Sequence, residues 1–148
     1  MTDDEYWIWA LSEWNLDLSV SEIISLLIQG YEVNSRVVKT AKKIRENGYK
    51  TLICSNNFPA RINGLQQRFQ FLNDFDATVF SYEIGATKPS EKIFIELARR
   101  AKVETSGIVF ADDNDLNLDG AKSIGILTFR YTTFDQFITD LKSVNVNL

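Results

Sequence analysis

Five polar side chains of the sequence could together hold a phosphate group and a divalent cation. They are Ser55, Asn56, Lys88, Asp112 and Asp113. Two neighbouring carboxylates repel each other unless a cation or hydrogen-bond donors compensate their charge, and Mg²⁺ is suitable because it takes oxygen ligands and keeps several waters. A hydroxyl and amide groups can bind phosphate oxygens, while a lysine neutralises phosphate charge. These residue types therefore predict a phosphate–Mg²⁺ site in which the two aspartates hold the metal.

Each of these residues also has an ordinary structural role when it is considered alone. Asp and Asn favour turns and helix N-caps, so the run from Asp112 to Asp115 is equally typical of a solvated turn. Ser55 alone is typical of a turn or a cap, and Lys88 alone of a solvated loop. The functional interpretation depends on position, because each cluster follows an apolar run in a repeating strand–loop–helix pattern.

The elements that must position these side chains form an α/β core over residues 34–148. Four apolar runs are predicted strands, at residues 49–54, 77–80, 108–111 and 126–129. They alternate with segments whose apolar residues recur at helical spacing, which predicts a Rossmann-like parallel sheet with helices on both faces. Since the carboxyl ends of parallel strands share one edge of a sheet, the polar clusters are expected along one rim.

Residues 1–33 are predicted to form a helical lobe ahead of that core. An acidic N-cap at Asp3 or Asp4 begins a first helix, and Ser19 with Glu22 forms a capping box for a second helix. The two helices make a hairpin of their own, so the chain is expected to have two domains, residues 1–33 and residues 34–148.

The composition excludes several classes of function. The chain has 148 residues, a formal net charge of -4 and no basic cluster that indicates a nucleic-acid groove. No apolar run approaches the ~20 residues of a membrane-spanning helix. The sequence has no histidine, which removes histidine-based triads and most zinc chemistry. A single cysteine, Cys54, and an acidic N-terminus where a signal peptide would be basic predict a cytoplasmic protein.

The order Ser55, Lys88-Pro89, Asp112-Asp113 resembles the haloacid dehalogenase-like (HAD) hydrolase superfamily over about residues 37–129. The resemblance implies that Ser55 and its neighbour Asn56 bind the substrate phosphate and that Lys88 steadies both the nucleophile and the transferred phosphate. It also implies that Asp112 and Asp113 bind Mg²⁺ and that the substrate is a small phosphorylated metabolite. Residues 1–33 look like part of the helical cap that such enzymes insert.

One departure from the family pattern changes the expected activity. Family members open with a strand that ends in Asp-x-Asp, whose first Asp is the nucleophile and whose second is a general acid/base. That strand lies mid-sheet, between the strands that lead to Ser55 and to Asp112, and the sequence has no such segment before residue 34. We therefore expect a truncated phosphohydrolase with little or no activity alone.

Two alternatives remain open at this stage. One is a non-catalytic binding or regulatory module on a HAD-like scaffold, in which the sheet closes across the gap or a partner chain, including a second copy in a homodimer, adds the missing strand. The other is a receiver-like domain, which also combines an acidic pair, a hydroxyl and a lysine around Mg²⁺. Receiver-like domains carry the acidic pair early, whereas here Asp112 and Asp113 come last.

Overall fold

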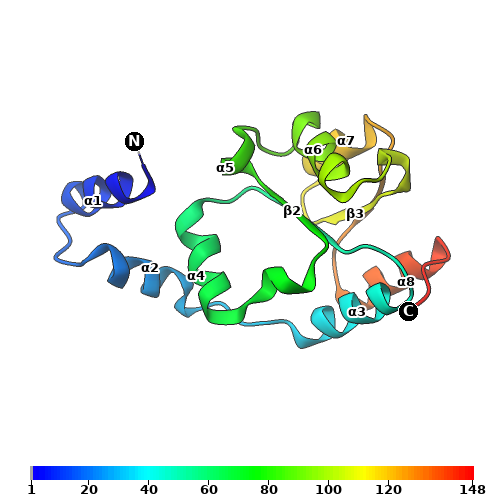
Figure 1. Ribbon diagram of the computed structural model, residues 1–148, viewed down its shortest axis with the longest axis horizontal. Coiled ribbons are helices and arrows are strands. Elements are labelled where there is room, and N and C mark those ends of the chain that lie inside the picture. Colours follow the sequence, from blue (N-terminus) through cyan, green and yellow to red (C-terminus); the bar gives the residue numbers. More distant parts are fainter. Residues whose placement is uncertain (1) are drawn as a thin grey trace. The chain divides into compact units, whose positions relative to one another are not determined.

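The computed structural model describes residues 2–148, which form two compact units (Figure 1). The first unit contains residues 2–33 and 57–71, and the second contains Asn34–Asn56 and Leu72–Leu148. No helix among the described residues is both long enough and apolar enough to span a membrane. The sequence predicts a single boundary at residue 33, whereas the structure also assigns residues 57–71 to the N-terminal unit.

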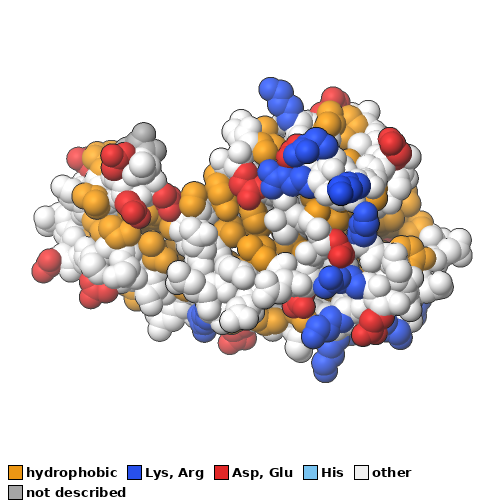
Figure 2. Space-filling model, in the orientation of Figure 1, with side chains coloured by type: hydrophobic (Ala, Val, Ile, Leu, Met, Phe, Trp, Pro, Cys, Tyr) orange, Lys and Arg blue, Asp and Glu red, His pale blue; other side chains and the backbone are white. Residues whose placement is uncertain are grey.

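Three helices make up the first unit, and their bounds are α1 (Asp3–Glu13), α2 (Val20–Gln29) and α4 (Pro59–Phe69). The predicted capping box of α2 is confirmed, since the Ser19 N–H donates to Glu22 Oε2 at 2.8 Å and the Glu22 N–H donates to Ser19 Oγ at 3.3 Å. Residues 2–33 contain no lysine or arginine, and Figure 2 shows several acidic side chains over this part of the surface. The acids of the first turn of α1 suit the positive end of its helix dipole.

Close packing of α4 on α2 explains why residues 57–71 belong to this unit. A Cβ added at Gly64 would lie 3.1 Å from the Ile28 side chain, so the two helices approach closely there. Arg68 Nη1 donates to the carbonyls of Ile28 and Gln29, at 2.8 and 3.1 Å, and thereby satisfies acceptors at the carboxyl end of α2.

The second unit alternates helices and strands as the sequence predicts. Its helices and strands are α3 (Ser35–Glu46), β1 (Leu52–Ser55), β2 (Ala77–Phe80), α5 (Ser81–Ile84), α6 (Glu91–Ala101), β3 (Val109–Asp112), α7 (Asp115–Lys122), β4 (Leu127–Arg130) and α8 (Phe134–Ser143), with a short 3₁₀ turn at Thr105–Gly107. A second 3₁₀ turn, Phe71–Asp74, includes the last residue of the first unit. The α/β class and the parallel direction of the strands are confirmed.

The four strands form two separate parallel pairs rather than one sheet. Leu52 of β1 lies opposite Ala77 of β2, and Val109 of β3 lies opposite Leu127 of β4. Among residues 2–148 no strand pairing joins β1 to β3. The expected single sheet is therefore interrupted between β1 and β3. The family resemblance places there a strand that the sequence does not contain. The two strand pairs have not closed across this gap.

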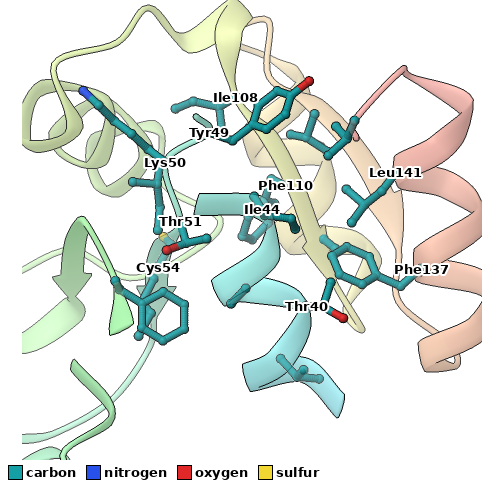
Figure 3. A pocket seen from close by; sticks show the side chains of 18 of the residues that line it. Thr40, Ile44, Tyr49, Lys50, Thr51, Cys54, Ile108, Phe110, Phe137 and Leu141 are labelled. Atoms are coloured by element: carbon teal, nitrogen blue, oxygen red, sulfur yellow. The ribbon is translucent and has the colours of Figure 1, made fainter. Parts of the chain in front are cut away.

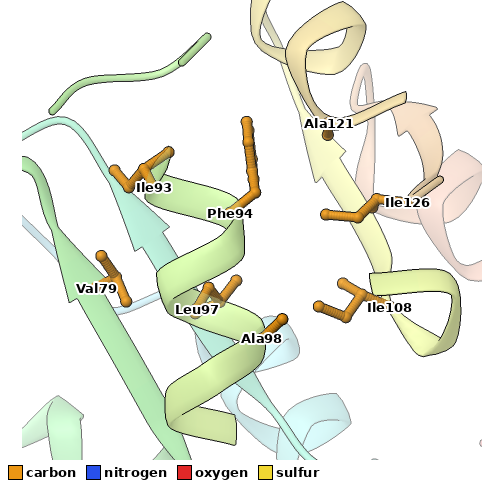
Figure 4. Close-up of a cluster of buried hydrophobic side chains, with 8 residues drawn as sticks. All are labelled: Val79, Ile93, Phe94, Leu97, Ala98, Ile108, Ala121 and Ile126. Atoms are coloured by element: carbon orange, nitrogen blue, oxygen red, sulfur yellow. The ribbon is translucent and has the colours of Figure 1, made fainter. Parts of the chain in front are cut away.

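Helix α6 holds the two strand pairs together through an apolar core (Figure 4). Ile93, Phe94 and Leu97 of α6 are almost fully buried, and they pack in one cluster with Val79 of β2 and Ile108, which precedes β3. Side-chain packing thus joins elements that backbone hydrogen bonds do not. Burial of these large apolar side chains is the main contribution to the folding stability of the second unit.

Candidate active site

A buried ion pair between Lys88 and Asp112 is the centre of the candidate site. Lys88 Nζ lies 2.5 Å from Asp112 Oδ2, and the two side chains are only 10% and 8% exposed. Lys88 lies in the loop between α5 and α6, and Asp112 is the last residue of β3. The structure therefore brings together two of the five residues that the sequence singles out, although 24 positions separate them.

Hydrogen-bond donors hold Asp112 in its ionised form. Its Oδ1 accepts from the Asn114 N–H at 2.9 Å and from Asn117 Nδ2 at 3.0 Å. Burial alone would raise the pKa of Asp112, but the hydrogen bonds from Lys88, Asn117 and the Asn114 N–H outweigh it and keep this pKa below its usual value. The carboxylate is therefore negative at neutral pH, and both of its oxygens accept from donors of the chain.

Asn56 holds the loop of Lys88 in place. Its Oδ1 accepts from the Lys88 N–H at 2.7 Å, and its Nδ2 donates to the Lys88 carbonyl at 3.1 Å. The sequence predicts Asn56 as a substrate-binding residue, but both polar atoms of its amide are engaged with the backbone of Lys88. In the structure Asn56 is therefore a positioning residue, and it connects the end of β1 to the lysine.

Three strand-end segments consequently meet on one rim, as expected. Ser55 ends β1 directly before Asn56, Asn56 bonds to Lys88, and Lys88 bonds to Asp112 at the end of β3. Asn56, the Lys88 ammonium and the Asp112 carboxylate thus form one continuous set of hydrogen bonds, and Ser55 is the residue before it in the chain. Asp113 follows Asp112 and is exposed to solvent.

A close approach of α7 to the lysine loop fixes this arrangement. A Cβ added at Gly120 would lie 2.0 Å from the Pro89 carbonyl oxygen, so a larger residue cannot occupy the position without a shift. By family resemblance Gly120 belongs to the motif that carries Asp112 and Asp113, but its contact with Pro89 depends on tertiary packing and has no local signature in the sequence.

We expect Gly120→Ala to destabilise the protein by roughly 1–3 kcal/mol, although alanine is the better helix former. The added methyl group must displace the Pro89 backbone and with it the loop that carries Lys88. Thermal unfolding measures this effect. Gly30→Ala is the control, because nothing lies within 4 Å of its added Cβ. Equal unfolding temperatures for the two variants would contradict the close approach.

The outer part of the rim is an open depression of about 520 Å³ lined by Asp113, Asn114, Asp115, Leu116 and Arg130. Arg130 Nη1 is paired with Asp115 Oδ2, which raises the pKa of the guanidinium further. Asp115 therefore has a basic partner, whereas Asp113 has no ion pair among residues 2–148. Asp113 is thus the carboxylate of the rim best placed to take a cation from solvent.

The donor set fits an ion that keeps most of its water ligands. Among the described residues no group of three or more His, Cys, Asp or Glu side chains is arranged to enclose a metal. Two adjacent acids, Asp112 and Asp113, would suit Mg²⁺, because it loses water reluctantly and uses one or two carboxylates. The single thiol takes no part, since burial raises the pKa of Cys54 to about 12 and keeps it protonated.

The sequence profile of the haloacid dehalogenase-like hydrolases matches residues 14–125, which is 112 of the 148 residues. The chain belongs to the HAD-like hydrolase family. It is 25% identical over 132 residues to bifunctional epoxide hydrolase 2 of Mus musculus, covering 86% of this chain and 24% of that protein. It is also 34% identical over 95 residues to glyceraldehyde 3-phosphate phosphatase of Methanopyrus kandleri, covering 64% of this chain and 41% of that enzyme.

Solved HAD structures share the fold of the chain. A wild-type HAD enzyme of Bacteroides thetaiotaomicron, in complex with magnesium and inorganic phosphate, superposes with a TM-score of 0.82 at 20% identity, over 93% of this chain and 74% of that one. A HAD phosphatase of Thermococcus onnurineus gives a TM-score of 0.75 at 21% identity, over 95% and 71% of the two chains. The HAD chain spans less than half the length of the curated relatives named above.

Proposed function

We propose that this HAD-family chain carries the phosphate- and metal-binding half of a phosphohydrolase site for a small phosphorylated metabolite. The observation that supports the proposal best is the buried Lys88–Asp112 pair at a rim that also carries Ser55 and Asp113. Two related proteins are named as phosphatases of glyceraldehyde 3-phosphate and D-ribitol 5-phosphate. We propose a substrate of the same class and a cytoplasmic location, which suits a chain whose single cysteine excludes an internal disulfide.

Each residue of the rim has a distinct part in this proposal. The Ser55 hydroxyl and backbone N–H groups beside it donate to the phosphate oxygens. Lys88 neutralises charge that develops on the phosphoryl group, and Asn56 keeps its backbone in place. Asp112 and Asp113 would hold Mg²⁺, which when bound supplies charge stabilisation at the transferred phosphoryl group.

We further propose that the 148 residues bind phosphate and Mg²⁺ without turning over a phosphate ester. The rim supplies a lysine, a hydroxyl and two metal-binding acids, and each of these has a binding or charge-neutralising role. By resemblance the attacking carboxylate belongs to a strand between β1 and β3, and no such strand is formed by residues 2–148. A generic aryl phosphate with Mg²⁺ is therefore expected to be hydrolysed at the uncatalysed rate.

A second candidate is a non-catalytic binding or regulatory module that a partner chain completes. The interruption between the two strand pairs favours it, because unpaired strand edges require hydrogen-bond partners. Size-exclusion chromatography with light scattering separates a self-completed homodimer from other forms. A stable monomer would count against the homodimer.

A pair of matched variants tests the metal-binding half-site. We expect Asp113→Asn to weaken Mg²⁺ binding, measured by isothermal titration calorimetry in the presence of phosphate, by more than about tenfold. Asp119→Asn should leave binding unchanged, because Asp119 is an exposed acid of α7 that lies beside Lys122 at 3.6 Å. Both changes remove one exposed carboxylate, so their effects on net charge are equal. Equal affinities for the two variants would contradict the proposed function.

A further inference from the structure

Two buried hydrogen-bond donors of the first unit, Trp7 Nε1 and Arg61 Nε, have no acceptor among residues 2–148. Trp7 is only 7% exposed, and Arg61 forms no ion pair in the part of the chain that the structure describes. Buried polar groups of folded proteins are almost always hydrogen-bonded. An indole N–H and a guanidinium N–H left unsatisfied in one small unit therefore point to an acceptor from outside the chain.

The large apolar cavity of the second unit is lined by groups of a different kind (Figure 3). It has a volume of about 800 Å³, and apolar side chains such as Ile44, Phe110 and Phe137 form its wall. Lys50 is the charged residue among its described lining residues, and its ammonium already donates to the Ala101 carbonyl at 2.6 Å. Unsatisfied donors suited to a charged ligand are therefore a feature of the first unit.

The ring of Phe58, the N-cap residue of α4, is the contact that the two donors share. The ring centroids of Trp7 and Phe58 are 5.9 Å apart, and the guanidinium carbon of Arg61 lies 4.5 Å from the centre of the Phe58 ring. No side chain caps the amino end of α4, so the positive end of its helix dipole adds to the charge of the guanidinium. An indole N–H, a guanidinium and a helix amino end around one ring favour an anion.

Arg61 is the basic side chain of this unit that is available to a ligand. The other one, Arg68, donates to the carbonyls of Ile28 and Gln29. The acids of the unit outnumber its arginines, and they are Asp3, Asp4, Glu5, Glu13, Asp17, Glu22 and Glu32. Because this excess negative charge repels a dianion more than a monoanion, it favours a carboxylate over a phosphate dianion. A planar guanidinium also matches a carboxylate through two parallel hydrogen bonds.

Aromatic rings beside the two donors indicate the nature of the rest of the ligand. The guanidinium carbon of Arg61 lies 6.0 Å from the ring centre of Tyr31, which is 40% exposed. The ring centroids of Trp7 and Tyr6 are 5.5 Å apart, and Tyr6 is 38% exposed. A ligand body that covers these rings removes apolar surface from water, and this is favourable only where the body itself is apolar.

We propose that the first unit binds a small acid that has one carboxylate and an apolar body. The carboxylate accepts from the Arg61 guanidinium and the Trp7 indole N–H, beside the uncapped amino end of α4. The apolar body packs on the exposed rings of Tyr31 and Tyr6. This site consists of residues of the first unit alone, so it goes beyond the phosphate–Mg²⁺ half-site proposed for the second unit.

Titration of the full 148-residue chain with sodium hexanoate tests the proposal. The readout is the indole N–H signals of the three tryptophans in nitrogen–proton correlation NMR spectra. We expect a saturable shift of the Trp7 signal, because its N–H gains an acceptor. Hexanamide has the same shape and no charge, so it should bind at least about tenfold more weakly. Equal affinities for the two compounds, or no shift of the Trp7 signal with hexanoate, would overturn the proposal.

Matched variants assign the two donors. Arg61→Gln should weaken hexanoate binding at least about tenfold, whereas Arg99→Gln, which removes the same charge from an exposed position of α6, should leave it unchanged. Trp7→Phe keeps an aromatic ring and removes the indole N–H, so binding followed at the Arg61 Nε–H signal should weaken at least about threefold. Trp14→Phe, which removes an exposed indole, is its control. Unchanged affinity in Arg61→Gln and Trp7→Phe would overturn the proposal, and the comparison with hexanamide decides it if either variant fails to fold.

Two further ligands test the carboxylate and the apolar body separately. Acetate lacks the apolar body and should bind at least about tenfold more weakly than hexanoate. Inorganic phosphate without Mg²⁺ should shift the Trp7 signal less than hexanoate does at equal concentration. Equal affinities for acetate and hexanoate would overturn the apolar body, and tighter binding of phosphate at Trp7 would overturn the carboxylate.

The outcome is separable from that of the proposed phosphate–Mg²⁺ half-site. Asp113→Asn should leave the affinity for hexanoate unchanged, because Asp113 belongs to the second unit. Loss of hexanoate binding in this variant would overturn a site formed by the first unit alone. Mg²⁺ binding without hexanoate binding would refute this inference only, and the reverse result would refute the half-site only.

Discussion

Replacing Asp112 with Asn is expected to lower the free energy of unfolding by about 3 kcal/mol, since it leaves a buried ammonium without its counter-ion. Lys88 is only 10% exposed and lies 2.5 Å from the carboxylate, so water cannot readily replace the lost partner. The melting temperature should fall by roughly 10 °C for a unit of this size. Asp113→Asn, an exposed neighbour, should change stability by less than about 0.5 kcal/mol.

A double-mutant cycle separates the ion pair from other effects of the substitution. Lys88→Met in the Asp112→Asn protein removes the unpaired charge, so the double variant should be more stable than Asp112→Asn alone.

The pH dependence of the free energy of unfolding has a definite sign. The pKa of Asp112 in the folded protein lies below its ordinary value of 3.8. The ionised carboxylate therefore contributes fully to the free energy of unfolding above pH 3.8, and this contribution is lost as the pH falls below that value. A loss no larger than that of Asp113→Asn would contradict the buried pair.

Adding a peptide strand that ends in Asp-x-Asp is expected to produce Mg²⁺-dependent phosphatase activity that the chain alone lacks. A strand that lies between β1 and β3 and parallel to both would deliver the residues after its apolar centre to the rim of Ser55 and Lys88. By family resemblance the first of those aspartates attacks phosphorus and displaces the aryl alcohol, and water then hydrolyses the aspartyl phosphate. Hydrolysis of an aryl phosphate should rise at least about a hundredfold above the rate without peptide.

The control peptide has Asn in place of the first Asp and the same apolar centre. It should bind equally well and give no turnover, because an amide cannot act as the nucleophile. Equal hydrolysis with both peptides would contradict a role for the added carboxylate. Turnover at ordinary enzymatic rates without any peptide would contradict the proposal that residues 1–148 are inactive alone.

Local patterns in the sequence were sufficient to predict the α/β class and the order of the strands. The run 108–111 followed by two acids predicts a strand that stops at Ala111, and β3 ends one residue later, at Asp112. The run 49–54 predicts a strand that starts too early, since β1 begins at Leu52. Tyr49 is outside the strand, and its hydroxyl donates to the Asn145 carbonyl. That contact joins residues 96 positions apart and has no local signature.

Tertiary contacts account for the features that the sequence could not provide. Asn56 has the side-chain chemistry of a phosphate ligand, but its two hydrogen bonds go to the backbone of Lys88, 32 residues later. The placement of α4 with the N-terminal helices depends on the close approach at Gly64 and the bonds from Arg68. The division into two strand pairs depends on which strands pair with each other, and the periodicity of a single strand does not determine its pairing partner.

The central claim is that the rim of Ser55, Lys88, Asp112 and Asp113 binds a divalent cation together with phosphate. Mn²⁺ prefers the same oxygen ligands as Mg²⁺ and is paramagnetic, so it broadens amide NMR signals close to its binding site. We expect substoichiometric Mn²⁺ with phosphate to broaden the signals of Asp112, Asp113 and Asn114 first. Selective broadening at the acidic first turn of α1, or none at the rim, would contradict the claim.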